Sequence, residues 1–330
     1  MIMDLNLTNM SEKHTPDTQK VNVLILGSGP AGLSAALYAA RADLKPVVLS
    51  GMDLGGQVSL TYAVENYPGF PDGVGGQELV ELFKKQAERF GARVEFDTAT
   101  QVDLTNRPFR IRTYNTEYLA DTLIISTGAT PRHLNIRGET ELTGRGVSYC
   151  ATCDGWFFKG KDVVVVGGGD SALEEGLFLT RYANSVTIIH RRNQFRAGAV
   201  LQERARGNPK LRFIMDTVVS EILGEEAVKA VRLRNLLTGE DYEHPADGVF
   251  IFIGHNPNTE LFKDQLEMDE NGYLNVNMQM QTNIPGVFVA GEVGDPFYRQ
   301  VITSAGMGAA AAMQAIHYID EHVVREKVPG

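Results

Sequence analysis

The sequence has few cysteines, an excess of acidic over basic residues, and no long apolar run. Its 330 residues include two Cys, Cys150 and Cys153, too few for a disulfide framework or a four-cysteine zinc site. Lys and Arg number 31 against 41 Asp and Glu, and the resulting net charge of −10 argues against nucleic acid or an anionic membrane surface as the main partner. No apolar run approaches the roughly 18 residues that a membrane-spanning helix needs. We therefore expect no metal site, no nucleic-acid partner and no membrane partner.

The start of the chain does not resemble a signal peptide. Residues 1–20 are polar and lack both an apolar segment and a small-residue cleavage site. We expect them to form a disordered extension, with ordered structure from Val21 onward. The absence of a signal, together with the sparse cysteines, predicts a cytoplasmic protein.

Glycine is abundant, at 34 residues, and two glycine motifs each stand between a predicted strand and a predicted helix. The first unit reads as strand Val21–Leu26, turn Gly27-Ser28-Gly29-Pro30-Ala31-Gly32, helix Leu33–Ala42 and strand Pro46–Leu49. The second reads as strand Val163–Val166, turn Gly167-Gly168-Gly169-Asp170-Ser171-Ala172, helix Leu173–Tyr182 and strand Ser185–His190. A chain of this length favours two domains. The sequence thus predicts an α/β protein with two Rossmann-like units.

Further elements are expected around these units. Helical periodicity predicts helices over Gly75–Phe90 and from Ser304 to about Tyr318, and short apolar runs predict strands over Val94–Phe96, Phe109–Thr113, Thr122–Ser126, Gly248–Gly254 and Val287–Gly291.

A glycine turn between strand and helix is typical of dinucleotide binding. The first glycine makes the turn, the second lets the backbone approach a pyrophosphate, and the third position lets helix and strand pack closely, with the helix N-terminus facing the anion. Gly27, Gly29 and Gly32 satisfy this pattern, whereas the second unit has Gly167 and Gly169 with Ala172 in the third position. A purely structural turn is the alternative for both.

The strand that follows each turn indicates which nucleotide is bound. In the second unit it ends in His190-Arg191-Arg192, with Arg196 close behind. Three guanidinium groups can hold a 2′-phosphate, so NADPH is favoured over NADH; the alternative is a solvated basic loop. The first unit has Ser50 at the corresponding point, which suits a different dinucleotide, and we expect FAD there.

The two cysteines form one C-x-x-C motif, Cys150-Ala151-Thr152-Cys153, followed by Asp154. Such a pair can be half of a zinc site, a structural pair or a redox dithiol, and the absence of clustered His makes zinc improbable. A redox pair needs a neighbour that manages protons, and the Asp154 carboxyl can donate a proton to a leaving thiolate. The alternatives for Asp154 are a helix N-cap and a solvated loop acid.

In this order the motifs resemble those of the bacterial-type, low-molecular-weight thioredoxin reductases. The resemblance runs from about Val21 to about Ile319 and rests on the glycine turns, Cys150–Asp154, His190-Arg191-Arg192, and the strings Gly55-Gly56-Gln57, Glu65-Asn66-Tyr67-Pro68-Gly69, Ser126-Thr127-Gly128-Ala129 and Tyr298-Arg299-Gln300. It implies a homodimeric flavoprotein of two Rossmann-like, three-layer ββα domains. The FAD-binding domain would comprise residues 21–131 and 257–330, and the NADPH-binding domain, residues 132–256 with the C-x-x-C, would be inserted into it.

The resemblance also implies a site, residue by residue. FAD would contact Gly27, Gly29, Pro30, Ala31, Gly32, Gly55, Gly56, Gln57, Asn66, Thr127, Gly128, Gly291, Glu292, Arg299 and Gln300. NADPH would contact Gly167, Gly169, Ser171, Glu174, His190, Arg191, Arg192 and Arg196. By the same transfer Cys153 lies against the flavin, Cys150 attacks the protein substrate, and Asp154 is the proton donor.

One position departs from the family pattern. The family has Gly-Asp near the C-terminus, where the carboxylate bonds a hydroxyl of the flavin ribityl chain, and this chain has Gly291-Glu292. The spacing to Tyr298-Arg299-Gln300 puts Glu292, and not Asp295, in the position of the acid. The extra methylene moves the carboxylate by about 1.5 Å, so we expect altered flavin contacts but retained FAD binding.

The implied reaction is NADPH-dependent thioredoxin-disulfide reduction, with electrons passing from NADPH through FAD and the Cys150–Cys153 pair to thioredoxin. The dithiol and the nicotinamide need the same flavin face, and rotation of the NADPH domain about Gly128–Arg132 and Gly254–Pro257 would serve both. A flavoprotein disulfide reductase with a different partner or electron donor, and a flavin- and NADPH-binding redox sensor, are the alternatives. The flavoprotein of alkyl hydroperoxide reduction is disfavoured, because only about twenty residues precede Val21, too few for its extra domain.

Overall fold

The computed structural model describes residues 17–61 and 63–323, which group into two compact units. Of these residues, 17–58, 80–128 and 259–323 belong to unit 1, and 59–61, 63–79 and 129–258 belong to unit 2. The chain passes between the units after residues 58, 79, 128 and 258. The limits of the functional domains given above, at 131 and 257, stay a prediction.

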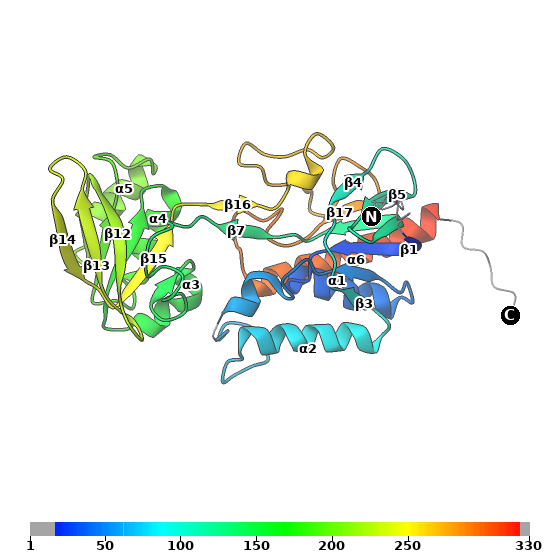
Figure 1. Ribbon diagram of the computed structural model, residues 1–330, viewed down its shortest axis with the longest axis horizontal. Helices are drawn as coiled ribbons and strands as arrows, with labels where there is room; N and C mark the ends of the chain where they lie inside the picture. Colours follow the sequence, from blue (N-terminus) through cyan, green and yellow to red (C-terminus); the bar gives the residue numbers. More distant parts are fainter. Residues whose placement is uncertain (1–16, 62, 324–330) are drawn as a thin grey trace, which may run out of the picture. The chain divides into compact units, whose positions relative to one another are not determined.

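Unit 1 is built on a seven-stranded sheet (Figure 1). Its strands are β1 (Asp17–Leu26), β2 (Val47–Leu49), β3 (Arg93–Glu95), β4 (Gln101–Asp103), β5 (Phe109–Arg112), β6 (Thr116–Ile125) and β17 (Val287–Val289). The order is β3-β2-β1-β6-β5-β4, and β17 also pairs with β6. β5 runs antiparallel to β4 and β6, and the other pairs are parallel. The carboxyl ends of β1, β6 and β17 therefore meet at one edge, where a Rossmann-like unit binds its ligand.

The first strand begins earlier than the sequence predicts. β1 starts at Asp17, so residues 17–20 are part of the sheet and not of a disordered extension. They pair in parallel with residues 116–119 of β6, which supplies hydrogen-bond partners although their side chains are polar. Residues 1–16 of the predicted extension lie outside the described residues.

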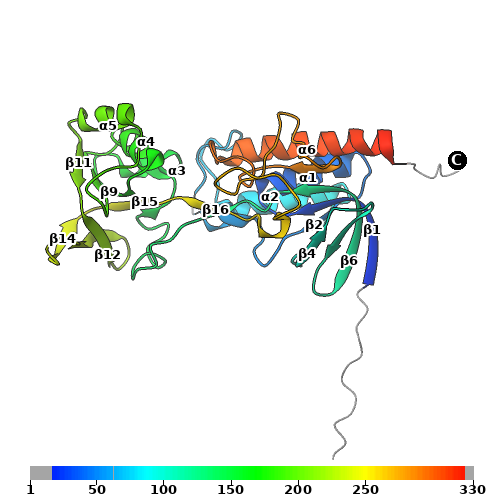
Figure 2. The same ribbon diagram turned by 90° about the horizontal axis from the view of Figure 1, so that it is seen from above.

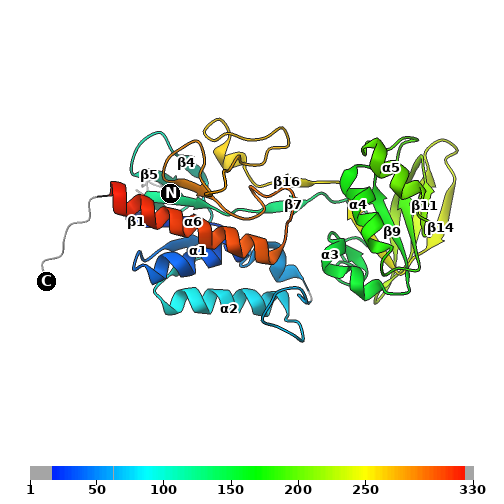
Figure 3. The same ribbon diagram turned by 180° about the vertical axis from the view of Figure 1, so that it is seen from behind.

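Two helices with small side chains pack side by side on one face of this sheet (Figure 3). They are α1 (Pro30–Arg41) and α6 (Val301–His322), and their alanines are buried against Val23, Ile25 and Ile124. The opposite face, which carries Leu24 and Leu123, packs on a second cluster of buried apolar residues. The 3₁₀ helix η3 (Glu260–Phe262) also belongs to unit 1, whereas α2 (Gly76–Arg89) and the 3₁₀ helix η1 (Gly56–Leu60) contain residues of both units.

Unit 2 has a parallel five-stranded sheet with helices on one face and an antiparallel sheet on the other (Figures 1 and 2). The parallel strands, in the order β11-β10-β9-β15-β8, are β8 (Val147–Ser148), β9 (Asp162–Gly167), β10 (Ser185–Ile189), β11 (Leu211–Ile214) and β15 (Gly248–Phe252). The antiparallel strands are β12 (Thr217–Gly224), β13 (Val228–Asn235) and β14 (Asp241–Pro245). The helices are α3 (Ala151–Asp154), α4 (Asp170–Leu179), α5 (Ala199–Arg206) and the 3₁₀ helix η2 (Gly155–Phe158).

Strand β9 shows how the sequence specifies these layers. All four of its valines are buried. Val163 and Val165 belong to the apolar cluster that contains Leu173 of α4, whereas Val164 and Val166 belong to the cluster that contains Val231 of β13. A continuous apolar run is what a strand covered on both faces requires. The three layers of unit 2 agree with the expected ββα arrangement, and the fold class is confirmed.

The two predicted hinge segments pair with each other. β7 (Ala129–Pro131) and β16 (His255–Pro257) form a two-stranded antiparallel sheet. Arg132 extends this pairing, because its backbone N–H donates to the carbonyl of Gly254 at 2.9 Å.

None of the helices within residues 17–61 and 63–323 has the length and apolar character that a membrane span requires.

Candidate functional site

The first glycine turn packs so tightly that two of its glycines cannot be replaced without rearrangement. Gly27 has φ +107°, and a Cβ there would lie 2.3 Å from the carbonyl oxygen of Ser126. A Cβ on Gly32 would lie 1.9 Å from the carbonyl oxygen of Gly27. Gly29 differs, because its nearest neighbour would be the carbonyl oxygen of Gly55 at 3.9 Å. The outer glycines therefore bring strand and helix together, and the middle one leaves room for a ligand to approach.

Several predicted FAD residues of unit 1 gather around this turn. A Cβ on Gly56 would lie 3.8 Å from the Cα of Gly29, and one on Gly291 would lie 2.9 Å from the Cβ of Ala31. Ser28 holds the segment that contains Gly55 and Gly56 in place, since its hydroxyl accepts a hydrogen bond from the backbone N–H of Gly55 at 3.0 Å. Pro30 and Ala31 form the first turn of α1. Backbone groups close to a helix N-terminus fit the pyrophosphate of a dinucleotide.

The other predicted FAD residues differ in their placement. Thr127 and Gly128 directly follow Ser126, whose hydroxyl donates to the carbonyl of Leu26 at 2.9 Å, so they lie at the carboxyl end of the sheet beside the glycine turn. Gln57 is exposed in η1. Asn66 is exposed as well, but it lies in the segment that belongs to unit 2. The contacts of all these residues with FAD stay predictions.

Two acids, Glu292 and Asp295, lie between β17 and α6 and contact different groups. Asp295 is buried, and its carboxylate accepts hydrogen bonds from the backbone N–H groups of Phe297, Tyr298 and Arg299 at 2.9–3.2 Å. Glu292 lies 3.8 Å from the guanidinium of Arg299. Burial raises the pKa of Glu292 to about 7, although Arg299 acts in the other direction. The Asp295 carboxylate is thus committed to the loop, and the contact of Glu292 with FAD stays a prediction.

Helix α6 begins where two predicted FAD residues stand. Gln300 is its N-cap, and Gln300 and Thr303 form a reciprocal capping box that satisfies backbone N–H groups of the first turn. Arg299 has φ +52°, in the left-handed region. Its backbone N–H donates to the Asp295 carboxylate at 3.2 Å, which stabilises this conformation. The start of the helix is therefore stabilised by the capping box and by the Asp295 carboxylate.

The second glycine turn, in unit 2, has the same construction as the first. A Cβ on Gly167 would lie 2.4 Å from the carbonyl oxygen of Phe252 and 2.7 Å from the Cβ of Ala172. Gly169 is again the open position, with Arg196 Nη2 at 3.7 Å as its nearest neighbour. Helix α4 starts directly after it, and Ser171 and Glu174 are exposed on the first two turns. Alanine in the third position is accommodated because it packs against Gly167.

The basic loop after β10 is anchored to this turn through its backbone. The N–H of Arg196 donates to the carbonyl of Gly168 at 2.8 Å. Arg191, Arg192 and Arg196 are exposed, so their guanidinium groups are available to a phosphate near the open face of Gly169. The arrangement fits the predicted 2′-phosphate contacts of NADPH, which stay a prediction.

His190 faces the interior and not the solvent. Its side chain is buried and stacks on Phe195 with 5.4 Å between ring centroids. Its Nε2 lies 3.1 Å from the carbonyl oxygen of Gln194, and a Cβ on Gly168 would lie 2.3 Å from the ring. Burial lowers the pKa of His190, and the surrounding arginines lower it further. A neutral imidazole thus fixes the loop that carries the arginines, and its own contact with NADPH stays a prediction.

The cysteine pair of unit 2 is oxidised. Cys150 and Cys153 form a disulfide with 5.3 Å between their Cα atoms. Cys150 is the N-cap of the short helix α3, and its sulfur accepts from the backbone N–H of Cys153 at 3.2 Å. Both cysteines are half-buried, and Thr152 between them is exposed. The pair can therefore cycle between disulfide and dithiol while remaining accessible at one side.

The Asp154 side chain bonds to Ser148 and makes no capping hydrogen bond. It is the N-cap residue of η2, but its side chain makes no capping hydrogen bond. Its Oδ2 instead accepts from the hydroxyl of Ser148 at 2.5 Å. Burial raises the pKa of Asp154, and the bond from Ser148 offsets part of that effect. The N-cap alternative is therefore wrong for this side chain, whereas its role as proton donor stays a prediction.

Ser148 is the residue of this site that sequence reasoning missed. It stands at the end of a two-residue strand, six positions before Asp154, and no motif spacing connects the two. A Ser-x-Cys string is too short a pattern to indicate a contact that depends on how α3 turns back on the strand. The only available signal was its nearness to Cys150 in the sequence.

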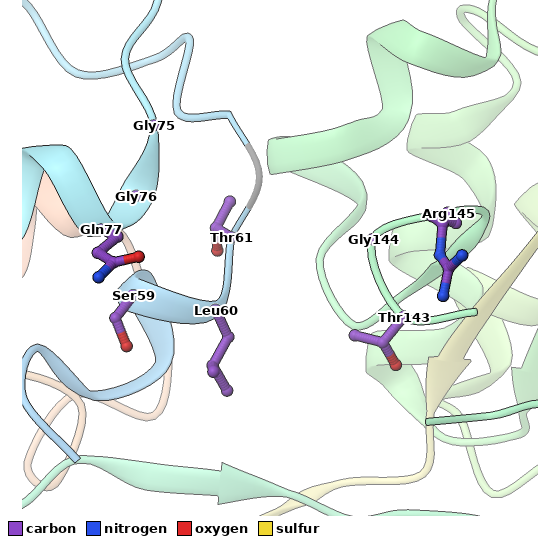
Figure 4. Close-up of a pocket in the computed structure, with 9 residues that line it drawn as sticks. All are labelled: Ser59, Leu60, Thr61, Gly75, Gly76, Gln77, Thr143, Gly144 and Arg145. Atoms are coloured by element: carbon purple, nitrogen blue, oxygen red, sulfur yellow. The ribbon is translucent and has the colours of Figure 1, made fainter. Parts of the chain in front are cut away.

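A pocket lies in unit 2 (Figure 4). It is lined by Ser59, Leu60, Thr61, Gly75, Gly76, Gln77, Thr143, Gly144 and Arg145. None of the predicted cofactor or cysteine-site residues lines it.

Comparison with known proteins agrees with this construction. The family described as pyridine nucleotide-disulphide oxidoreductase matches residues 21–314. The thioredoxin reductase of Streptomyces coelicolor is 50% identical over 297 residues, covering 89% of this chain and 92% of that protein. The thioredoxin reductase of Rickettsia bellii is 51% identical over 304 residues, covering 91% of this chain and 98% of that protein.

Solved structures show the same relationship. The crystal structure of thioredoxin reductase from Streptococcus pyogenes is 42% identical, with a TM-score of 0.88, and the match covers 92% of this chain and 99% of that one. Thioredoxin reductase from Giardia duodenalis is 40% identical with the same TM-score and the same coverage. The chain therefore belongs to the pyridine nucleotide-disulphide oxidoreductase family and, within it, to the thioredoxin reductases.

Proposed function

We propose that the protein transfers electrons from NADPH through FAD to the Cys150–Cys153 disulfide and from there to the disulfide of a thioredoxin. The observation that carries this proposal is the half-buried disulfide with the Asp154 carboxyl, of raised pKa, bonded to Ser148 beside it. A sensor without turnover needs no such dithiol and no proton donor. By the family resemblance the protein works as a homodimer in the cytoplasm.

The two glycine turns support the choice of cofactors. The turn of unit 1, with Gly29 open and the start of α6 fixed by Gln300, would hold FAD. The turn of unit 2, with Gly169 open and three exposed arginines behind it, would hold NADPH. When bound, these cofactors supply the two electrons that reduce the disulfide; the residues of the chain position them and handle protons.

The cysteines and Asp154 would complete the exchange with thioredoxin. After reduction, the Cys150 thiolate attacks one sulfur of the thioredoxin disulfide, so that a mixed disulfide forms and the leaving sulfur becomes a thiol. The Cys153 thiolate then attacks the Cys150 sulfur, which re-forms the Cys150–Cys153 disulfide and releases the second thioredoxin sulfur as a thiol. Asp154 supplies a proton to a leaving thiolate, for which its raised pKa is suited.

Substitution of the two cysteines tests this assignment. Cys150→Ser should abolish thioredoxin reduction while NADPH still bleaches the flavin absorbance, because hydride transfer to the flavin does not involve the pair. Cys153→Ser is the matched control, since it keeps the attacking thiol and should accumulate a mixed disulfide with thioredoxin that mass spectrometry detects. Full thioredoxin reductase activity in Cys150→Ser would show that Cys150 is not the nucleophile.

A further inference from the structure

Ser148 is the buried hydroxyl through which Asp154 is connected to the cysteine pair. It ends strand β8, where Ser148 is paired with Phe250 of β15, and only 5% of it is exposed. Its Oγ lies 2.5 Å from Asp154 Oδ2, 3.1 Å from the backbone N of Cys150 and 3.2 Å from the backbone O of Cys150. One oxygen atom thus contacts the acid and both backbone polar groups of the attacking cysteine.

These three contacts suit both protonation states of Asp154. A serine hydroxyl donates one hydrogen bond and accepts two. When Asp154 is ionised, the hydroxyl donates to Asp154 Oδ2 and accepts from the Cys150 N–H. When Asp154 is protonated, its O–H donates to Ser148 Oγ, which still accepts from the Cys150 N–H and turns its own proton to the Cys150 carbonyl. Every partner is satisfied in each state, and no heavy atom has to move.

We propose that Ser148 is a positioning residue for proton transfer at the cysteine pair: its hydroxyl holds the Asp154 carboxyl beside Cys150 and reverses its hydrogen bond when Asp154 gains or loses a proton. This proposal rests on the assignment of Asp154 as the proton donor. Its physical advantage is that the donor stays in place through the whole cycle, since the reorganisation on proton transfer is limited to one O–H rotation.

The pKa of Asp154 depends on its burial and on Ser148, and no neighbouring charge is among its causes. Helix α4 packs against α3 and carries Asp170, Glu174 and Glu175. None of these three carboxylates is a cause of the pKa shift of Asp154, which burial raises and the bond with Ser148 partly offsets. The only titratable groups of α3 and its N-cap besides Asp154 are the two cysteines that it would serve. Removing the hydroxyl therefore takes one hydrogen-bond partner from the Asp154 carboxyl and one each from the backbone N–H and carbonyl of Cys150.

Ser148→Ala in the flavin-loaded protein tests the proposal. We expect the kcat of thioredoxin reduction to fall at least about tenfold, within the contribution of general acid catalysis, while the KM for thioredoxin stays unchanged. Because the hydroxyl lowers the pKa of Asp154, its removal should also shift the fall of kcat with rising pH to higher pH. Ser148→Thr, which keeps a hydroxyl, should restore both properties.

The matched control is Ser185→Ala. The hydroxyl of Ser185 donates to Asp162 Oδ1 at 2.6 Å in the same unit but away from the cysteines, so its loss should leave kcat and the pH profile unchanged. A cycle with Asp154→Asn separates positioning from a structural role. If Ser148 acts through Asp154, then Ser148→Ala lowers kcat no further in the Asp154→Asn background.

Three results would overturn the proposal. They are an unchanged kcat and pH profile in Ser148→Ala, a fall in kcat of equal size in the Asp154→Asn background, and an equal fall in Ser185→Ala. Failure of the proposed function is a different result, because then the wild-type protein itself would not reduce thioredoxin with NADPH.

Discussion

Glu292 shows how the environment of a single residue changes its chemistry. Its carboxyl is largely buried, with one guanidinium 3.8 Å away and the carboxylate of Asp295 acting against ionisation. Burial is the largest cause, and it raises the pKa from the usual 4.5 to about 7. Near neutral pH this acid can therefore donate a hydrogen bond as well as accept one, which an ordinary carboxylate cannot do.

The raised pKa predicts a pH-dependent gain in stability for Glu292→Gln. Above pH 7 the folded wild-type protein carries a buried charge that glutamine lacks, and each unit of pKa shift corresponds to roughly 1.4 kcal/mol. Below about pH 4.5 the acid is protonated in both the folded and the unfolded state, so the difference disappears. The melting temperature of Glu292→Gln, relative to the wild type, should thus be higher at pH 8 than at pH 5 in flavin-free protein. Glu292→Asp keeps a titrating group and is the control; a pH-independent difference would contradict the assigned pKa.

The exposed arginines after β10 predict discrimination between the nicotinamide cofactors. Replacing both Arg191 and Arg192 with Ala should raise the KM for NADPH at least about tenfold, since each lost charge-assisted bond contributes roughly 1.5–3 kcal/mol. The KM for NADH should change little, because NADH has no 2′-phosphate. Steady-state kinetics with both cofactors provides the measurement, and equal effects on both would remove the 2′-phosphate assignment.

At the residue scale, the sequence predicts candidate chemical groups but not the side chains that surround them. The cysteine pair, Asp154 and the arginines follow from local strings, because the residue types are rare and closely spaced. The bond between Ser148 and Asp154 and the inward orientation of His190 depend on tertiary packing, which no string of residues records. Both features arise only when α3 and the loop after β10 are folded against their neighbours.

At the scale of the element, the glycine motifs fix where helices start. Both α1 and α4 begin three residues before the predicted starts, at Pro30 and Asp170. The middle glycine of each motif is the extended N-cap, and the last residue of the motif already lies in the first helical turn. The prediction placed the helix after the whole motif, and the structure shows that the second half of each motif is already the start of the helix.

The antiparallel sheet of unit 2 was not predicted. The sequence patterns above predict no element between His190 and Gly248, yet α5, β11 and the strands β12–β14 lie there. Strand β14 (Asp241–Pro245) consists of polar residues and a proline, and its side chains alternate between exposed and half-buried positions. Pairing with β13 places it in a sheet, and such pairing is non-local information.

Helix α6 offers two glycines that test close packing between elements. A Cβ on Gly308 would lie 2.0 Å from the carbonyl oxygen of Ala31 in α1, whereas a Cβ on Gly306 would meet nothing within 4 Å. Gly308→Ala should therefore destabilise the protein by about 1–3 kcal/mol, because backbone must move. Gly306→Ala should be neutral or stabilise it by up to about 1 kcal/mol, through helix propensity. Chemical unfolding of both variants provides the comparison, and equal stabilities would contradict the close approach of α1 and α6.

At the scale of the whole molecule, the same architecture occurs in both units, with different residues around the glycine turn. Each unit has a sheet with parallel strands, a glycine turn with an open middle position, and a helix that starts at that turn. In unit 1 the turn is surrounded by Gly55–Gly56 and Gly291, and in unit 2 by the arginine loop. The duplication could be predicted from the sequence because both turns are local motifs, whereas the pairing of β7 with β16, which are more than 120 residues apart in the chain, could not.

Stepwise electron transfer is the central claim, and anaerobic titration of the flavin-loaded protein tests it most directly. One equivalent of NADPH should bleach the flavin absorbance, NADH should do so poorly, and added oxidised thioredoxin should restore the absorbance as its own disulfide is reduced. A protein that binds no flavin, or a flavin that NADPH bleaches but thioredoxin does not reoxidise, would contradict the account.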